Sequence, residues 1–322
     1  MEDLTDWLQD ELEFAGKVEV PPGNWQVTQK LLADTSEKLV ICGSGSLTWT
    51  CPDGGLDITY RDVRKAPEVH GLTLQTALAG GGTALRITSP VSASATAGGA
   101  LVRGVAVSGQ SPAANFWTEG LRFKDCWYST VDGFTFKGQD DAAVPFAAQA
   151  GVVFEACQAM YLRDFNVWHC ENAVLQTGAT HGEGLNASTF ELVGVNRGFN
   201  LCSSPAGNGH IIRAGHINAY SRGIVMANRP WMTISECLII KTHVSISNWV
   251  GIELANCAKP TITGCQIYGQ GGSAGPNTGI HAYGAGTQRG LITGNRIGDF
   301  TQIGQGIFLS GGAHHCTVTN NV

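Results

Sequence analysis

A four-residue pattern recurs from residue 120 onward and constrains the fold more than any other feature of the chain. It consists of a small residue, an apolar residue, any residue and then, as a rule, a large apolar residue. Successive copies are 31, 21, 26, 25, 28, 28 and 27 residues apart. Self-similarity at such a period is typical of solenoids, in which each repeat packs only on its neighbours. The copies begin at Gly120, Gly151, Asn172, Gly198, Gly223, Gly251, Gly279 and Gly306.

Between these copies lie further short segments that alternate apolar and polar residues, as in 162–167 and 292–297, and similar segments occur upstream at 69–74 and 102–107. Alternation of this kind predicts short strands joined by Gly, Asn and Ser turns. One such unit cannot bury its own apolar face, but units stacked about 4.8 Å apart pair every backbone group with the next coil. No segment after residue 20 has a convincing helical period. The pattern therefore predicts an all-β fold, namely a single-stranded parallel β-helix.

The composition agrees with this prediction. The 322 residues include 43 Gly, and only 14% are charged, whereas ordinary chains carry roughly 7% Gly and about 25% charge. This excludes a helical bundle, and 43% hydrophobic residues make disorder unexpected. The net charge is −6, and the basic residues do not cluster into a stripe, so nucleic acid is not an expected partner. No apolar run is long enough to insert into a membrane, and the acidic first ten residues do not resemble a secretory signal.

The ten cysteines include no Cys-x-x-Cys pair. We therefore expect buried, reduced thiols with a structural role, and neither a metal site nor a cofactor. Five of them fall in columns, because they lie six or fourteen residues after the start of their coil. Those at six are Cys126, Cys157 and Cys257, and those at fourteen are Cys237 and Cys265.

The two ends of the chain differ. Leu4, Trp7, Leu8 and Leu12 recur at helical spacing, which predicts an amphipathic helix within residues 1–16 that caps the solenoid. Residues 17–322 are predicted to form one continuous β-helix domain. The last residues stop inside a strand pattern, so we expect either further residues beyond them or a cap supplied by a partner chain.

The short helix, the Val-Pro-Pro-Gly-x-Trp-x-Val turn at 20–27 and the Gly-Leu-Thr-Leu coil at 71–74 resemble the pectate-lyase-like (pectin-lyase-like) right-handed parallel β-helix superfamily. Within it the chain is most similar to bacteriophage tailspike and capsular depolymerase proteins. This resemblance implies a parallel homotrimer that binds and usually cleaves a bacterial surface polysaccharide, such as a capsule, O-antigen or exopolysaccharide. It also implies a virion tail protein, assembled in the host cytoplasm and acting outside the cell.

Hydrolysis of a glycosidic bond needs two carboxyl groups roughly 5 to 9.5 Å apart. Asp140 and Asp141 are adjacent in the longest interval between copies of the pattern, where a loop could reach over a groove. The pair resembles the Asp-Asp of polygalacturonases, although Gly209-His210-Ile211 lies too far downstream to match that family's histidine. A solvated loop is the alternative.

A second group of candidates lies in the next coil. Its acids Glu155, Asp164 and Glu171 are catalytic candidates, and Trp168, His169 and Arg163 are candidates for binding sugar, because an indole stacks on a pyranose face while charged groups bond its hydroxyls. A surface salt bridge from Glu155 to Lys124, which lies at the same offset one coil earlier, is the alternative.

Glu253 and His281 share an offset on consecutive coils and are predicted to be outward neighbours that bind substrate, with the imidazole tuned as a base. Simple neighbours along the strand ladder, with no functional role, are the alternative. A lyase acting on a uronic acid would need such a base and a cation beside the sugar carboxylate. In pectate lyases of the family that the chain resembles, an Asp cluster holds Ca²⁺ and an arginine is the base; Arg163, Arg213 and Arg222 are available, but no cluster of three Asp at adjacent offsets is visible. A metal-free mechanism with Tyr161 or a histidine stays open. The leading expectation is hydrolysis of a bacterial polysaccharide; a uronic-acid lyase or epimerase and a non-catalytic adhesin remain alternatives.

Overall fold

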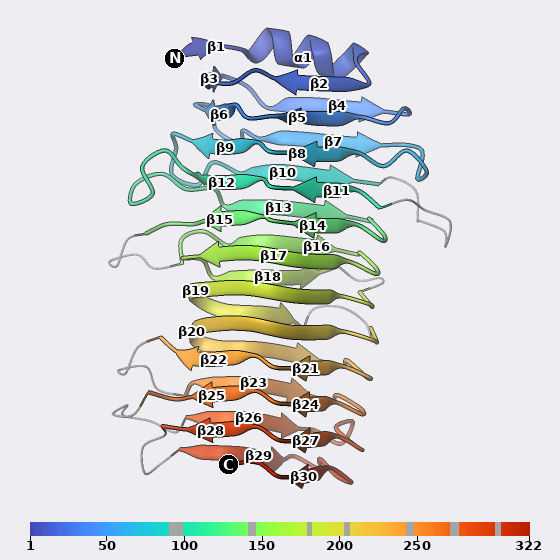
Figure 1. Cartoon of the computed structure of the whole chain (residues 1–322), viewed down its shortest axis with the longest axis vertical. Coiled ribbons are helices and arrows are strands. Elements are labelled where there is room, and N and C mark those ends of the chain that lie inside the picture. The colour runs from blue at the N-terminus through green and yellow to red at the C-terminus, as the bar shows by residue number, and fades with distance from the viewer. Residues whose placement is uncertain are drawn as a thin grey trace. The chain divides into compact units, whose positions relative to one another are not determined.

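The computed structural model describes residues 1–89, 99–140, 146–178, 182–202, 207–242, 248–270, 277–299 and 304–322. The chain divides into two compact units, Met1–Glu171 and Asn172–Val322, drawn from blue to yellow-green and from yellow to red in Figure 1. Each unit is a stack of coils whose strands run parallel, as the repeat predicted. The candidate Asp141 lies outside the described residues.

In the first unit, three sheets run along the stack, and each coil contributes one strand to each sheet. The first sheet contains β4 (Leu31–Thr35), β7 (Leu56–Tyr60), β10 (Thr83–Thr88), β13 (Glu119–Lys124) and β16 (Ala150–Glu155). The second contains β2 (Lys17–Val20), β5 (Val40–Gly43), β8 (Glu68–His70), β11 (Leu101–Arg103), β14 (Thr130–Asp132) and the start of β17 (Tyr161–Trp168). The third contains β1 (Glu2–Asp3), β3 (Asn24–Val27), β6 (Ser46–Trp49), β9 (Thr73–Thr76), β12 (Ala106–Gly109), β15 (Thr135–Lys137) and the end of β17.

The second unit repeats this arrangement, but β19 (Asn186–Leu201) and β20 (Ile211–Ala227) are long enough to pass through all three sheets. Its first sheet contains β18 (Asn172–Thr177), the ends of β19 and β20, β23 (Val250–Ala255), β26 (Thr278–Tyr283) and β29 (Gln305–Ser310). The second contains the starts of β19 and β20, then β21 (Thr233–Ser235), β24 (Thr261–Thr263), β27 (Leu291–Thr293) and β30 (Thr317–Thr319). The third contains the middles of β19 and β20, then β22 (Leu238–Lys241), β25 (Gln266–Tyr268) and β28 (Arg296–Gly298).

The apolar residue after each small residue forms a column in the core. Phe199, Ile224, Ile252 and Ile280 are partners on consecutive coils of the second unit, and each is fully buried. Burying such a side chain contributes roughly 1.5 to 3 kcal/mol. The residue that follows each of them points outward because strand side chains alternate, so the same pattern that builds the core also builds an outer column.

The small residue itself is required by close packing between sheets. A Cβ added to Gly251 would lie 2.5 Å from Ile267 Cγ2 and 2.7 Å from the carbonyl oxygen of Gly279. Gly223 meets Ile239 in the same way, at 2.4 Å. The pattern therefore marks where a strand of one sheet passes against a core side chain from another.

The five cysteines of the predicted columns are buried, whereas Cys42, Cys51, Cys202 and Cys316 are only half-buried. All ten are free, and six of them are buried. The thiol of Cys157 contacts the Phe123 carbonyl oxygen at 3.4 Å, and that of Cys257 contacts the Met226 carbonyl oxygen at 3.7 Å. Each sulfur thus bonds the backbone of the preceding coil in its own unit.

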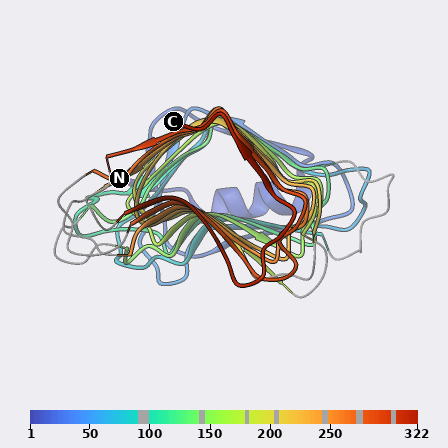
Figure 2. The ribbon, with the colours of Figure 1, turned by 90° about the horizontal axis from the view of Figure 1, so that it is seen from below.

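Helix α1 (Thr5–Phe14) covers the start of the first unit, as expected for a cap. Its buried residues Leu8 and Leu12 face β2 and β4, and Gln9 bonds both the N–H and the carbonyl of Leu32. In Figure 2 the helix lies over the interior of the first coils. Trp7, expected on the apolar face, is 40% exposed. No helix among the described residues is long and apolar enough to cross a membrane.

Candidate functional site

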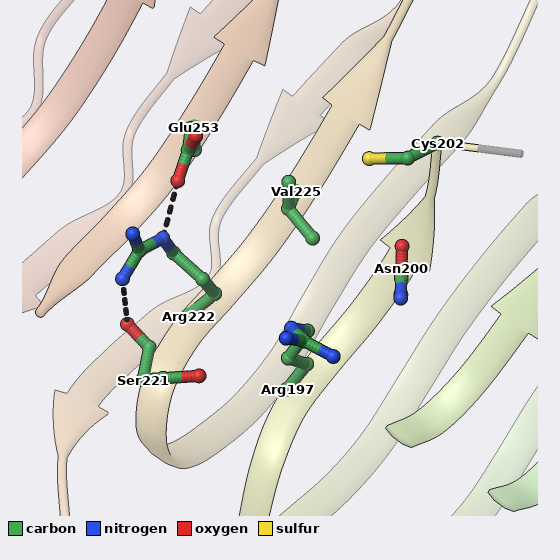
Figure 3. Close-up of a pocket in the computed structure, with 7 residues that line it drawn as sticks. All are labelled: Arg197, Asn200, Cys202, Ser221, Arg222, Val225 and Glu253. Atoms are coloured by element: carbon green, nitrogen blue, oxygen red, sulfur yellow. Dashed lines mark hydrogen bonds and ion pairs between the residues drawn. The ribbon is translucent and has the colours of Figure 1, made fainter. Parts of the chain in front are cut away.

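A polar pocket of about 470 Å³ lies on the outer face of the first sheet of the second unit. Strands β19, β20 and β23 supply its walls (Figure 3). Its chemistry comes from two guanidinium groups and one carboxylate, with amide, hydroxyl and thiol groups around them. The lining residues are Arg197, Asn200, Cys202, Ser221, Arg222, Val225 and Glu253.

These residues come together because the register aligns two outward columns. Asn200, Val225 and Glu253 are partners on three consecutive coils. Arg197 and Arg222 are partners one position before the small residue of their coils. Strict alternation would place residues three positions apart on opposite faces, yet both columns line the same pocket, as Figure 3 shows.

An ion pair between Glu253 and Arg222 forms one wall of the pocket. Arg222 Nε donates to Glu253 Oε2, while its Nη1 donates to the carbonyl oxygens of Ser221 at 3.0 Å and Asn248 at 2.7 Å. The carboxylate side chain is only 15% exposed. Figure 3 shows the guanidinium group held between Glu253 and Ser221. A fixed, partly desolvated guanidinium group of this kind suits recognition of a carboxylate or phosphate.

The next coil places two titratable rings beside Glu253. The hydroxyl of Tyr283 donates to Glu253 Oε1 at 3.1 Å. His281, the register partner of Glu253, lies between Tyr283 and Phe308 with ring centroids at 4.7 and 4.9 Å, and its Nε2 is 2.9 Å from Ser310 Oγ.

Burial sets the protonation of both rings. It lowers the pKa of His281 below the ordinary value of 6.5, with Arg222 acting in the same direction and Glu253 opposing it. Burial and the Glu253 charge raise the pKa of Tyr283 above 10.0. At neutral pH the coil next to the pocket therefore carries a neutral imidazole that can accept a proton and a phenol that can donate one.

Cys202 does not have the character of a nucleophile. Burial, together with the charge of Glu253, raises the pKa of its thiol to about 11. Nucleophilic cysteines need a lowered pKa, because the thiolate is the reactive form.

The predicted neighbours Glu253 and His281 are confirmed as partners on consecutive coils. Sequence reasoning missed Arg197, Asn200 and Tyr283. A signal for the first was present, since Arg197 and Arg222 each directly precede the glycine of their coil.

In the first unit, Asp140 lies within a small charged cluster. Its carboxylate is 3.1 Å from Lys137 Nζ and 3.6 Å from His169 Nε2. The hydrogen bond to Lys137 and then the charge of His169 lower its pKa. Trp168 is the register partner of Lys137 and is half-buried. Asp140 is therefore held ionised, which suits a base or a nucleophile but not a general acid.

The other acid of the expected pair, Glu155, is engaged in ion pairs. Arg122 Nη1 donates to it at 2.5 Å, and Lys124 Nζ lies at 3.5 Å, so the salt bridge weighed as its alternative is present. Arg122 also holds the buried Glu119. This is the geometry of a structural ion-pair network.

The remaining candidates of this coil lie on separate parts of it. Arg163 Nη2 bonds Asp132 at 2.9 Å. Asp164 is exposed, with a left-handed backbone at φ 51° in the middle of β17. Glu171, half-buried, donates its N–H to the carbonyl of Ala148 at 2.8 Å. The described residues contain no group of three or more His, Cys, Asp or Glu that could hold a metal ion.

Stacked parallel coils with an outer-face polar pocket define a β-helix protein with a surface site. A family described as the right handed beta helix region matches residues 150–322, more than half of the chain, and the protein belongs to this family. No curated protein matches the chain.

Solved structures share the fold at low sequence identity. The Azotobacter vinelandii mannuronan C-5 epimerase AlgE6 A-module has a TM-score of 0.53 at 15% identity, with 100% of this chain and 95% of that chain covered. The Yersinia enterocolitica family 28 exopolygalacturonase has a TM-score of 0.52 at 10% identity, with 100% and 76% covered. These likenesses support the pectin-lyase-like right-handed β-helix architecture.

Proposed function

We propose that this protein acts on an acidic bacterial polysaccharide at a site made of the pocket residues Arg222 and Glu253 together with His281 and Tyr283 of the next coil. The observation that carries the proposal is the joint presence of the fixed Arg222 guanidinium group and a neutral base–acid pair on adjoining coils. The similar structures named above are an epimerase of mannuronan and a polygalacturonase, so both named activities concern polymers of uronic acids.

The chemistry follows from the side chains. Pairing of the sugar carboxylate with Arg222 or Arg197 stabilises the charge that develops when the C5 proton is removed. His281 accepts that proton. For a lyase, the electron pair forms a C4–C5 double bond, the C4–O4 bond breaks, and Tyr283 protonates the departing oxygen. For an epimerase, the same carbon regains a proton on its opposite face, with the Tyr283 hydroxyl as the donor.

Hydrolysis is the second candidate function. It is favoured by the cluster in which the ionised Asp140 faces His169 near the indole of Trp168, because a carboxylate base beside an aromatic platform suits a sugar. Its acid partner would come from the remaining candidates Asp141, Glu155, Asp164 and Glu171.

We further propose the setting of a phage tailspike, with a parallel homotrimer that uses this activity on the host surface from the virion tail. The helix–turn–coil pattern of the first residues supports this setting. Light scattering of the purified chain, at 33.9 kDa per protomer, tests for a trimer; a monomeric mass at micromolar concentration would contradict it.

The decisive experiment incubates the protein with polygalacturonate, alginate and neutral dextran, followed by capsule, O-antigen and exopolysaccharide preparations. Ultraviolet absorbance of a new double bond indicates elimination, and inversion at C5 by NMR indicates epimerisation. Reducing ends without that absorbance indicate hydrolysis, and binding without change indicates an adhesin.

Variants then test the pocket. Arg222→Met and His281→Gln are expected to lower turnover by roughly 10²-fold or more. Arg296→Met, an exposed cation on β28, is the matched control and should retain activity. Full activity of both pocket variants would contradict the assignment, and loss of activity on substituting Asp140 instead would favour the hydrolase.

A further inference from the structure

A second surface of the same unit carries a column of exposed side chains at the turn after the first sheet. Trp231, Lys259, Arg289 and His315 all adopt the left-handed conformation, with φ of 53°, 52°, 54° and 54°. Backbone bonds tie their turns together: the N–H of Trp231 bonds the carbonyl of Ala258, that of Lys259 bonds Gln288, and that of Arg289 bonds His314. The four residues therefore occupy equivalent places on consecutive coils, and we call them the corner column.

The corner column is exposed and positively charged. Trp231 is 55% exposed, and Lys259 Nζ lies 5.2 Å from the centre of its ring. Lys259, Arg289 and His315 are exposed as well. An exposed indole beside an ammonium group offers a stacking surface whose rim is charged.

No acidic residue offsets this charge locally. The turns that carry the column, 228–232, 256–260, 284–290 and 311–316, contain no Asp or Glu. Within the part of the chain that the structure describes, no carboxylate lies within ion-pair distance of Lys259 or Arg289. In contrast, most exposed cations of the first unit have such a partner, as Arg61 has Asp34 and Arg163 has Asp132.

We propose that the corner column binds a strand of an acidic polysaccharide laid along the stack of coils. Successive column positions are about 4.8 Å apart, so Lys259 and Arg289 present cations at short, regular intervals while Trp231 stacks on a sugar ring. The turns follow directly from β20, β23 and β26, whose outer face holds the pocket and its neighbours, so a bound strand lies beside the proposed reaction site. The choice of an acidic polymer rests on the proposed function.

The test measures binding of size-selected polygalacturonate oligosaccharides to the whole chain by calorimetry or affinity electrophoresis, with dextran as the neutral probe. Arg289→Glu and Lys259→Glu are each expected to weaken polygalacturonate binding roughly 5- to 10-fold at low salt, and Trp231→Ala by a similar factor. In 1 M salt, where the Debye length falls to about 3 Å, the effect of the charge reversals should shrink while that of Trp231→Ala persists.

Arg296→Glu is the matched control for Arg289→Glu, because it makes the same charge change at an exposed strand position of another sheet. It should leave affinity within about two-fold, in line with screening of distant surface charges. Circular dichroism and thermal melting of each variant establish that it is folded.

The outcomes separate this inference from the proposed function. Equal weakening by Arg296→Glu, unchanged affinity in the corner variants, or failure of the wild-type protein to bind polygalacturonate would overturn the inference. If corner variants lose affinity while Arg222→Met and His281→Gln keep full turnover, binding by the corner column is supported and the proposed reaction site is wrong. If corner variants bind normally while those pocket variants lose turnover, the reverse holds.

Discussion

The hydroxyl of Tyr283 donates a hydrogen bond to Glu253 Oε1 from the neighbouring coil, while Arg222 binds the other oxygen of the same carboxylate. One carboxylate thus orients both a phenol and a guanidinium group at the edge of a pocket. Since burial keeps His281 neutral beside them, the four side chains supply a cation, an acid and a base on three consecutive coils of the stack.

Replacement of Tyr283 by Phe should lower turnover on the cognate acidic polymer by roughly 10²-fold, because it removes the proton donor. The ring that packs on His281 is kept, so substrate binding and melting temperature should change little. Initial rates and calorimetric affinity measured on the same preparation check this. Loss of affinity in step with loss of turnover would contradict the assigned role.

The pH profile should report His281. A base must be neutral to act, so activity is present above its pKa and is lost as pH falls through it. Since burial lowers this pKa below 6.5, the acid limb of kcat/KM should lie below pH 6.5. The limb should move or vanish in His281→Gln, whereas an unchanged limb in that variant would assign the titration to another group.

Substitution of Glu253 by Gln should strengthen binding of polygalacturonate by roughly 3- to 10-fold while it lowers turnover, because the charge of Arg222 is then no longer neutralised. The exposed Glu236→Gln makes the same charge change outside the pocket and should leave affinity nearly unaltered. Affinities from calorimetry at two salt concentrations test this. Weaker binding by Glu253→Gln would show that the carboxylate itself contacts sugar.

Gly251→Ala should destabilise the fold by about 2 kcal/mol or more, because its Cβ would overlap Ile267 and the backbone of Gly279. Gly298→Ala is the control, since nothing lies within 4 Å of its added Cβ. Chemical denaturation of both variants measures the difference. Equal stability of the two would mean that the coils tolerate wider separation than the structure shows.

Arg122→Met should cost about 3 kcal/mol in the free energy of unfolding, because it leaves the buried Glu119 without its cation. Burial raises the pKa of Glu119, but the hydrogen bonds and charge of Arg122 outweigh it, and the net pKa is lowered from 4.5. This stabilisation is therefore present above about pH 4.5 and is lost as pH falls through the lower folded-state pKa.

Denaturation midpoints between pH 7 and pH 3 check this prediction. The wild-type advantage over Arg122→Met should narrow toward acid pH. An advantage that is independent of pH would assign the effect to packing of the arginine stem.

Repetition made much of the fold predictable from residues alone. Strand alternation and interval length predicted parallel coils, the buried cysteine columns, and the pairing of Glu253 with His281. Each of these depends on how many residues separate a side chain from the glycine of its coil. Residues at equal separations become neighbours in the stack, because every coil repeats the same short strand. The capping helix was predictable for the same local reason, from its apolar spacing.

The tertiary structure decided which outward residues meet across turns of unequal length. Trp231 and Lys259 lie eight residues after their glycines, but Arg289 lies ten after and His315 nine, so offset counting does not align the corner column. Register shifts in β19 between Val193 and Arg197 likewise change the count. Local sequence determines that a strand forms and which face is buried. Only the stacked backbone, by placing bulges and turns, determines that Arg222 and Tyr283 meet on Glu253.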